Sequence, residues 1–260
     1  MRLKQSVAAG GLVLAFLAPG NAQVINPSKI VDLTYRFDAS TIYWPGEHPF
    51  EHQYEKYGKT PDGYFYSSAR YAAPEHGGTH LDAPIHFNQN GLPADRVPLS
   101  DCVGPAAVID FSTRAAEDRD ATLGLADLKK YEAAFGRIPD GAIVIARSGW
   151  GKFWPDRKNY LGSDRADASD LHFPGFSPEV IRFLLGNRKP AAIAIDTASI
   201  DAGQAKEFPV HVLWLGSNHP AFENLANAEA LPPKGATVFC IPMKIGGGTG
   251  GPTRIFAVVP

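Results

Sequence analysis

The sequence has little cysteine, no surplus of positive charge and no long apolar run. Cys102 and Cys240 are its only cysteines, too few for a disulfide framework or a cysteine-rich zinc site. We interpret both as structural thiols, and whether they pair stays open. The 25 Lys and Arg face 27 Asp and Glu, a net charge of −2, so nothing favours binding to nucleic acid phosphates. These absences exclude nucleic-acid binders and disulfide-stapled domains.

Two common catalytic motifs are also missing or incomplete. No G-x-S-x-G sequence is present, so there is no signal for a serine nucleophile of the α/β-hydrolase type. Residues 246–251 do spell G-x-G-x-x-G, but only nine residues follow them. A dinucleotide site needs a helix after this motif and an acidic residue about 20 positions further on. We therefore interpret the glycines as a tight turn near the functional site.

The N-terminal segment has the layout of a secretory signal peptide. Arg2 and Lys4 precede an apolar stretch at residues 7–19, and residues 20–22 are small. The apolar stretch is shorter than the roughly 20 residues of a membrane span, although an uncleaved anchor or a tail is the alternative. We predict a signal peptide at residues 1–22 and one domain at residues 23–260. The protein is then exported, periplasmic or secreted, and not membrane-bound after cleavage.

Short apolar runs alternate with glycine and proline punctuation. Strands are predicted at residues 29–33, 106–111, 142–146, 191–195, 237–241 and 255–259. Continuous apolar runs of this length are typical of strands buried on both faces. Helices are predicted at residues 122–135 and 177–185, with a third, short helix at residues 221–230, while residues 43–71 and 150–174 are expected to be long irregular loops. The pattern predicts a single α/β domain with a mostly buried central β-sheet flanked by helices.

The strongest chemical signal is residues 74–87, PEHGGTHLDAPIHF, with three His and one Asp within eleven residues. Two glycines and a proline exclude a regular helix there. If residues 79–82 are extended, His80 and Asp82 point to the same face, and the glycines can fold His76 back beside them. Two imidazoles and one carboxylate with open coordination positions are typical of a catalytic metal site. The alternative is that these residues only cap turns.

His86 follows Asp82 by four residues and has two possible roles. It could be a fourth metal ligand, but we favour a general acid/base beside metal-activated water. Further along, His211 and Glu223 could add ligands to the first metal or build a second position that shares Asp82. His219 precedes a proline and is interpreted as a loop residue. Asp196 and the polar residues after it could orient ligands, although capping of turns is the better interpretation.

Residues 76–87, HGGTHLDAPIHF, resemble the signature of the metal-dependent cyclase family, which includes bacterial kynurenine formamidases and isatin hydrolases. The resemblance extends from about residue 31 to residue 260 and includes residues 148–150, 171–175, 196–201, 208–211, 223–225 and 242–244. Ala198 stands where many relatives have proline. The resemblance implies a swivelling β/β/α fold, a Mn²⁺ or Zn²⁺ cofactor with one or two ions per chain, and a homodimer or larger homo-oligomer.

The resemblance also assigns roles to single residues. His76, His80 and Asp82 match the ligands of the main metal, and His86 matches the catalytic acid/base. His211 and Glu223 match the second-metal ligands of the formamidases, whereas in isatin hydrolases the position of His211 contacts the substrate. Trp44 matches an aromatic position that contacts substrate, and a core tryptophan is its alternative. Phe65 and Phe153 are expected to stack on the substrate beside it.

The leading hypothesis is hydrolysis of the amide bond of a small cyclic or aryl amide, as in the ring opening of isatin. Two extra aromatic-rich stretches at residues 54–66 and 153–160, together with export, favour the isatin-hydrolase branch. Glu223 preserves the two-metal option and thereby favours the formamidases. The alternatives are hydrolysis of N-formylkynurenine, a lactonase on similar metal chemistry, or a periplasmic binding protein without catalysis.

Overall fold

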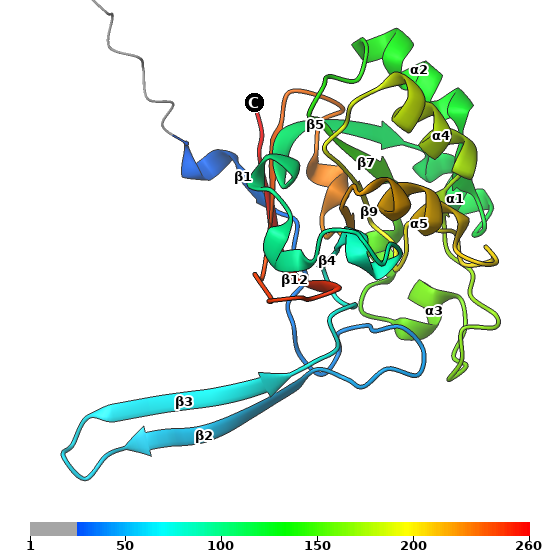
Figure 1. Ribbon diagram of the computed structural model, residues 1–260. Coiled ribbons are helices and arrows are strands. Elements are labelled where there is room, and N and C mark those ends of the chain that lie inside the picture. The colour runs from blue at the N-terminus through cyan, green and yellow to red at the C-terminus, as the bar shows by residue number, and fades with distance from the viewer. Residues whose placement is uncertain (1–24) are drawn as a thin grey trace, which may run out of the picture.

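The computed structural model describes residues 25–260, and the predicted signal peptide at residues 1–22 lies outside them. Within the described part, no helix combines the length and the apolar character of a membrane span. Figure 1 shows the arrangement, a sheet-based body from which one β-hairpin protrudes.

The body is built on one strongly curved sheet. Its strand order is β1 (Ile30–Asp32), β12 (Gly250–Val258), β11 (Thr237–Pro242), β5 (Val103–Asp110), β7 (Ile143–Arg147), β9 (Ala192–Ile195), β10 (Ala221–Glu223) and β4 (His80–Asp82). Because β4 also pairs with β12, the sheet closes into a barrel-like ring of seven strands, with β1 attached outside it. Neighbours from β5 to β10 run parallel, and the remaining pairs are antiparallel.

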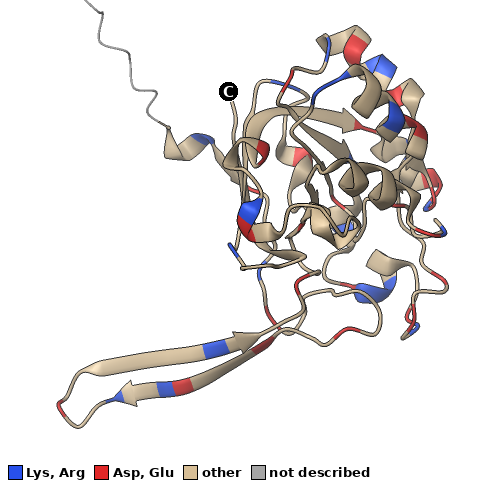
Figure 2. Cartoon of the chain, viewed as in Figure 1, with Lys and Arg blue, Asp and Glu red and all other residues tan. Residues whose placement is uncertain are grey.

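The parallel strands are buried on both faces, as their apolar runs predict. Along β7, Ile143 and Ile145 belong to the core inside the ring, while Val144 and Ala146 face the helices. The outer core is covered by α2 (Leu125–Phe135), α4 (Pro178–Asn187) and α5 (Pro209–Trp214), with α1 (Ser112–Glu117) at its edge. Figure 2 shows acidic and basic residues interspersed along the outer helices. The predicted single α/β domain with a buried sheet is confirmed, and the sheet is a closed one.

Most predicted elements are present with small shifts of their ends. All six predicted strands form, and so do the helices near residues 122–135 and 177–185. The first of these helices begins only at Leu125, because residues 122–123 form β6 (Thr122–Leu123), which pairs with β8 (Gly175–Phe176). Cys102 and Cys240 are buried free thiols.

The helix predicted at residues 221–230 is wrong. Residues 221–223 form β10, which lies between β9 and β4, and only residues 228–230 form a single 3-10 turn. Asn224 and Asn227 between them have φ of 55° and 50°, which breaks any helix. Pairing with two neighbouring strands therefore overrides the local helical propensity of this segment.

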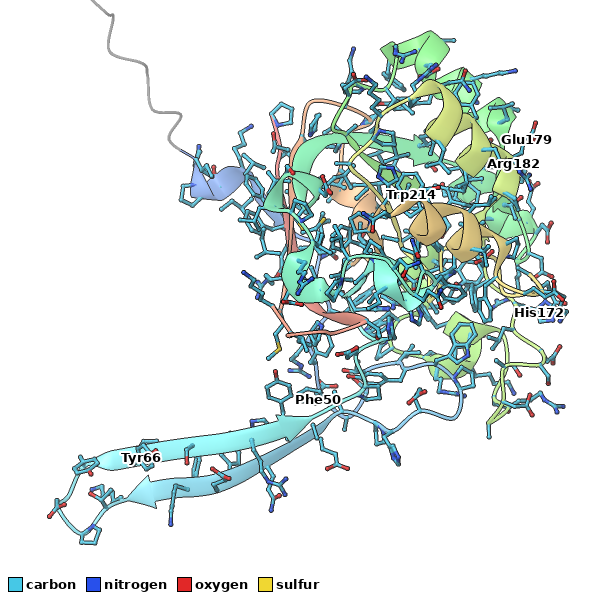
Figure 3. All side chains as sticks on the ribbon, in the orientation of Figure 1. Phe50, Tyr66, His172, Glu179, Arg182 and Trp214 are labelled. Atoms are coloured by element: carbon cyan, nitrogen blue, oxygen red, sulfur yellow. The ribbon has the colours of Figure 1, made fainter. Side chains whose placement is uncertain are left out.

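The long irregular segment predicted at residues 43–71 is also wrong, because most of it forms a hairpin of β2 (Glu51–Lys59) and β3 (Phe65–Ala72). The hairpin extends away from the body, with Phe50 at its base and Tyr66 near its tip (Figure 3). The segment at residues 150–174 contains a 3-10 turn and the short helix α3 (Arg157–Leu161) but is otherwise irregular. Its aromatic side chains pack into a third apolar cluster, beside the cavity described next.

Candidate metal centre

Strand β4 places two of the predicted ligands. Its residues are extended, so His80 and Asp82 lie on the same face, as predicted, with exposures of 2% and 1%. Glu223 of β10 lies directly opposite His80 in the antiparallel pair β4–β10. The same pairing that closes the ring thus brings a second buried carboxylate to the first cluster.

Two glycines bring His76 to this strand. Gly77 and Gly78 have φ of 152° and 56°, in the region that favours glycine. A Cβ on Gly77 would lie 2.1 Å from the ring of Tyr43, so no larger residue fits. The backbone therefore folds back, and His76 Nδ1 lies 2.7 Å from Asp82 Oδ1.

His211 comes from α5, on the opposite side of the cavity. Asp201 accepts hydrogen bonds from the backbone N–H groups of Val210 and His211 at the start of this helix. It also lies 2.7 Å from His211 Nδ1. Asp201, from the polar run after β9, is thus the residue that orients a candidate ligand. Asp196 instead accepts hydrogen bonds from residues 148–150, so its capping role is confirmed.

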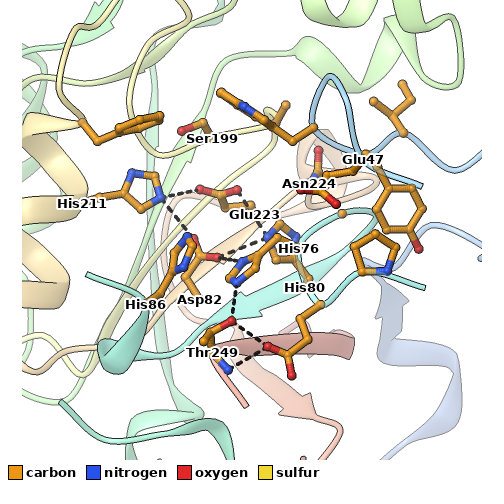
Figure 4. A pocket seen from close by; sticks show the side chains of 18 of the residues that line it. Glu47, His76, His80, Asp82, His86, Ser199, His211, Glu223, Asn224 and Thr249 are labelled. Atoms are coloured by element: carbon orange, nitrogen blue, oxygen red, sulfur yellow. Dashed lines mark hydrogen bonds and ion pairs between the residues drawn. The ribbon is translucent and has the colours of Figure 1, made fainter. Parts of the chain in front are cut away.

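The outer contacts of His80 and His211 define which nitrogen faces the centre. A carbonyl or a carboxylate only accepts, so His80 Nδ1–H donates to Gly78 O at 2.9 Å and His211 Nδ1–H donates to Asp201. The Nε2 atom of each ring then faces the centre. His80 Nε2 lies 3.2 Å from Asp82 Oδ1, and His211 Nε2 lies 3.4 Å from Asp82 Oδ2. Figure 4 shows these side chains converging.

Imidazole nitrogens and carboxylate oxygens this close repel one another unless a proton or a metal ion lies between them. When no metal ion is bound, Asp82 and Glu223 outweigh the opposing effect of burial and raise the pKa of His80 to about 9, so that a proton takes this place. Asp82 Oδ2 is buried and has no hydrogen-bond partner among the described residues. An unpaired buried carboxylate oxygen is costly, and a divalent cation satisfies it. The donor set therefore fits a metal ion.

Two groups of residues offer ligand atoms within 4.8 Å of one another. One is His76, His80 and Asp82, and the other is Asp82, His211 and Glu223. Asp82 is common to both and directs a different oxygen toward each: Oδ1 toward His76 and His80, Oδ2 toward His211. All five predicted ligands are thus brought together, although they come from four separate segments of the chain.

His86 belongs to neither ligand group. It ends a 3-10 turn at Pro84–His86, and its ring stacks on His76 with centroids 3.9 Å apart. One edge of the ring is exposed, but desolvation on its packed side lowers the pKa of His86 to about 4. The ring is therefore neutral near pH 7 and has a nitrogen that can accept a proton.

A cavity of about 470 Å³ opens above the cluster. Trp44 lines it and contacts Phe208, with ring centroids 6.1 Å apart. Phe87 also lines it and packs on His211 at 4.7 Å. The predictions for Phe65 and Phe153 are wrong: neither lines the cavity, because Phe65 is on the hairpin and Phe153 packs on Trp150.

Three residues of the site were not singled out by sequence reasoning. Glu75 and Thr249 contact each other beside His76, and Asn224 donates a hydrogen bond to the carbonyl of Gly78. Glu75 precedes the first histidine, which is a local signal. Thr249 lies in the glycine turn that was expected near the functional site, but its contact with His76, 173 residues away, leaves no local signal. His219 stacks on Trp214 and lies in a loop, as predicted.

Comparison with known proteins gives a consistent relationship. A sequence model of the family named Cyclase, described as "Putative cyclase", matches residues 31–202. An isatin hydrolase of Roseibium aggregatum is 36% identical over 208 residues, 76% of this chain and 77% of that protein. A kynurenine formamidase of Salinibacter ruber is 24% identical over 225 residues, 86% of this chain and 95% of that protein.

A solved structure agrees with the sequence comparison. The crystal structure of an isatin hydrolase bound to the product analogue thioisatinate has a TM-score of 0.82 and 32% identity, covering 89% of this chain and 92% of that chain. Because the family match covers well over half of the chain and a relative is more than 30% identical over three quarters of it, the protein is a member of the Cyclase family of metal-dependent hydrolases.

Proposed function

We propose that the protein is a metal-dependent hydrolase that cleaves the amide C–N bond of a small cyclic amide fused to an aromatic ring, as in isatin. The observation that carries the proposal is the combination of two buried ligand groups and an unligated His86 at the base of one aromatic-walled cavity. The similarity of this protein to an isatin hydrolase over most of the chain supports the choice of substrate class.

His76, His80 and Asp82 would hold the principal ion, which we propose to be Mn²⁺ or Zn²⁺. When bound, such an ion acts as a Lewis acid that polarises the amide carbonyl and makes a nearby water more acidic. Asp82, His211 and Glu223 form a second possible ligand group, so the chain can hold one or two ions. With one ion, burial is outweighed by Asp201, Asp82 and Glu223, which hold the pKa of His211 well above its usual value; its ring then carries a hydrogen on Nε2 as well as on Nδ1, and Nε2–H can donate to the substrate carbonyl.

His86 would move the proton in this reaction. Its neutral ring accepts a proton from the attacking water and returns it to the leaving nitrogen. Stacking on His76 holds the ring beside the ligands while one edge stays open to the cavity. Trp44 and Phe208 would contact the aromatic part of the substrate and exclude bulk water. The deep, polar end of the cavity thus receives the carbonyl, and the aromatic wall receives the ring.

The test is metal content together with turnover of isatin and N-formylkynurenine, with and without a chelator. We expect chelator-sensitive consumption of isatin and about one ion per chain. Consumption of N-formylkynurenine with two ions per chain would instead support kynurenine formamidase activity, the second candidate, which the second ligand group favours. Tightly bound metal with neither substrate consumed would contradict both activities and redirect the search to lactones or to binding alone.

We also propose that the protein is a homodimer formed through its hairpin. Directly opposite residues of β2 and β3 share a face, and one face is aromatic: His52, Tyr54, Tyr57, Phe65 and Tyr71. Tyr57 is 70% exposed and Phe65 59%. A lone two-stranded hairpin is only marginally stable in water, so a partner that covers this aromatic face would stabilise it.

A second copy of the chain fits this face by size. Four large rings that are each a little over half exposed would bury on the order of 400–600 Å² when covered, a large part of the roughly 800 Å² per partner of a stable interface. The opposite face carries Gln53, Lys56 and Arg70, with Tyr66 near the tip as its exposed aromatic residue. If two copies pair their aromatic faces about a twofold axis, each face covers the exposed apolar area of the other.

We further propose that residues 1–22 direct export and are then removed. The support is the basic start, the apolar stretch and the small residues of the sequence. Expression of the full chain in a bacterium, followed by periplasmic extraction and intact mass measurement, checks this. Unprocessed protein in the cytoplasm would contradict it.

A further inference from the structure

His76 differs from the other two candidate histidine ligands in how its outer nitrogen is held. His80 and His211 donate to a carbonyl and a carboxylate, which can only accept. The outer nitrogen of His76 is Nε2, and it lies 2.9 Å from Thr249 Oγ1. A hydroxyl can donate or accept, so this contact alone does not determine the tautomer of His76.

Glu75 removes the ambiguity. Its Oε2 lies 2.6 Å from Thr249 Oγ1 and 2.8 Å from the backbone N of the same residue. A carboxylate accepts only, so the single hydroxyl hydrogen of Thr249 points to Glu75. Thr249 Oγ1 must then accept from His76 Nε2–H, and Nδ1 is left free of hydrogen 2.7 Å from Asp82. Figure 4 shows Thr249 beside the imidazole of His76.

We propose that Glu75, acting through Thr249, is a positioning pair that holds His76 in the tautomer whose Nδ1 binds the metal. Outer-shell partners of this kind set both the tautomer and the orientation of a histidine ligand. Both residues line the cavity, but neither belongs to a ligand group, and in this assignment they act on His76. Their contribution is to the affinity for metal.

The glycine-rich turn at residues 246–251 is explained by the same contacts. A Cβ on Gly250 would lie 2.6 Å from His76 Cε1 and 2.4 Å from the carbonyl oxygen of Leu81. A Cβ on Gly248 would lie 2.9 Å from a carboxylate oxygen of Glu75. The glycines on both sides of Thr249 therefore let the turn lie flat against the imidazole and place the hydroxyl between it and Glu75.

The inference rests on the proposed metal site but not on the substrate, so it is tested with Zn²⁺ alone. The full chain is stripped of metal, and its Zn²⁺ affinity is measured by competition with a chromophoric chelator. The variants are Thr249→Val, which keeps the shape but loses the hydroxyl, and Thr249→Ser, which keeps the hydroxyl. Glu75→Met is the third, because it keeps the length of the side chain but removes the oxygen that accepts the hydroxyl hydrogen of Thr249, which can then turn toward His76.

We expect Thr249→Val and Glu75→Met to bind Zn²⁺ about 10–100-fold more weakly and Thr249→Ser to stay close to the unaltered protein. In the Zn²⁺-loaded unaltered protein, ¹⁵N spectra of the histidine rings should show hydrogen on Nε2 of His76. A purely structural role of Glu75 and Thr249 does not predict this tautomer. Circular dichroism of each variant checks the fold.

Three results would overturn the inference: equal Zn²⁺ affinity in Thr249→Val, a serine variant as weak as the valine variant, or hydrogen on Nδ1 of His76. Failure of the unaltered protein to bind Zn²⁺ is a different outcome, because it would contradict the metal site itself.

Discussion

The candidate metal centre at the rim of the barrel (His80, Asp82, His211 and Glu223), called the rim below, and the hairpin both depart from the usual distribution of side chains. They do so in opposite directions. At the rim, Asp82, Glu223 and two histidines are at least 95% buried, where charged groups are rare. On the hairpin, large aromatic rings such as Tyr57 are more than half exposed. Each arrangement is unfavourable for an isolated chain, so each indicates a missing partner of a definite kind.

The difference lies in what satisfies each region. The rim has acceptor atoms directed at one another from rigid strands, and only a small cation can lie among them. The hairpin exposes apolar area on a two-stranded ribbon that extends away from the body. Only another apolar surface can cover this area favourably. Four changes test this comparison.

Asp82→Asn should have the largest effect. Asp82 serves both ligand groups, so its loss should abolish tight metal binding and reduce kcat/KM by about 10⁴-fold, several kcal/mol of transition-state stabilisation. Metal content by mass spectrometry and turnover of the substrate measure it. A variant that keeps stoichiometric metal would show that the rim does not depend on this carboxylate.

His86→Ala separates proton transfer from metal binding within the same rim. We expect metal content to be unchanged, because His86 is in neither ligand group, and kcat to fall about 10³-fold. Asp82→Asn is the matched control, since it should lose both. Retained turnover in His86→Ala would remove this residue from the acid/base role.

The hairpin is tested by replacing Tyr57 and Phe65 with serine together. Each exposed ring is expected to contribute about 2 kcal/mol to dimerisation, so the loss of both should raise the dissociation constant by roughly 10³-fold. Analytical ultracentrifugation over a range of concentrations measures this. Lys56→Ser, on the polar face of the same hairpin, is the control and should leave the dimer intact. If the unaltered protein is a monomer, the dimer proposal is wrong.

Metal removal should have the smallest effect, and on stability. With free metal at 100 times its Kd, binding to the folded state adds about 2.7 kcal/mol, a rise in Tm of roughly 5–10 °C that a chelator reverses. Differential scanning calorimetry with and without chelator measures it. Asp82→Asn should show no chelator response, whereas the hairpin double variant should respond fully. The opposite pattern would mean that the two regions are not independent.

Local patterns made the centre of the site predictable. The side chains of an extended strand alternate, so His80 and Asp82 had to share a face, and paired glycines allowed His76 to fold back. The buried strands were equally visible as apolar runs. The segment at residues 221–223 was not, because its extended state depends on hydrogen bonds to β9 and β4.

The sequence by itself determined the identity of the chemistry: which residue types can bind a cation, and that one further histidine stands beside them. Only the tertiary structure decided that Glu223 lies opposite His80, that Asp201 orients His211, and that Glu75 meets Thr249 across 174 positions of the chain. It also decided that the aromatic residues of the hairpin face solvent and do not line the cavity. The physical reason is that strand pairing and ring closure are non-local, so their partners leave no periodic trace in either segment alone.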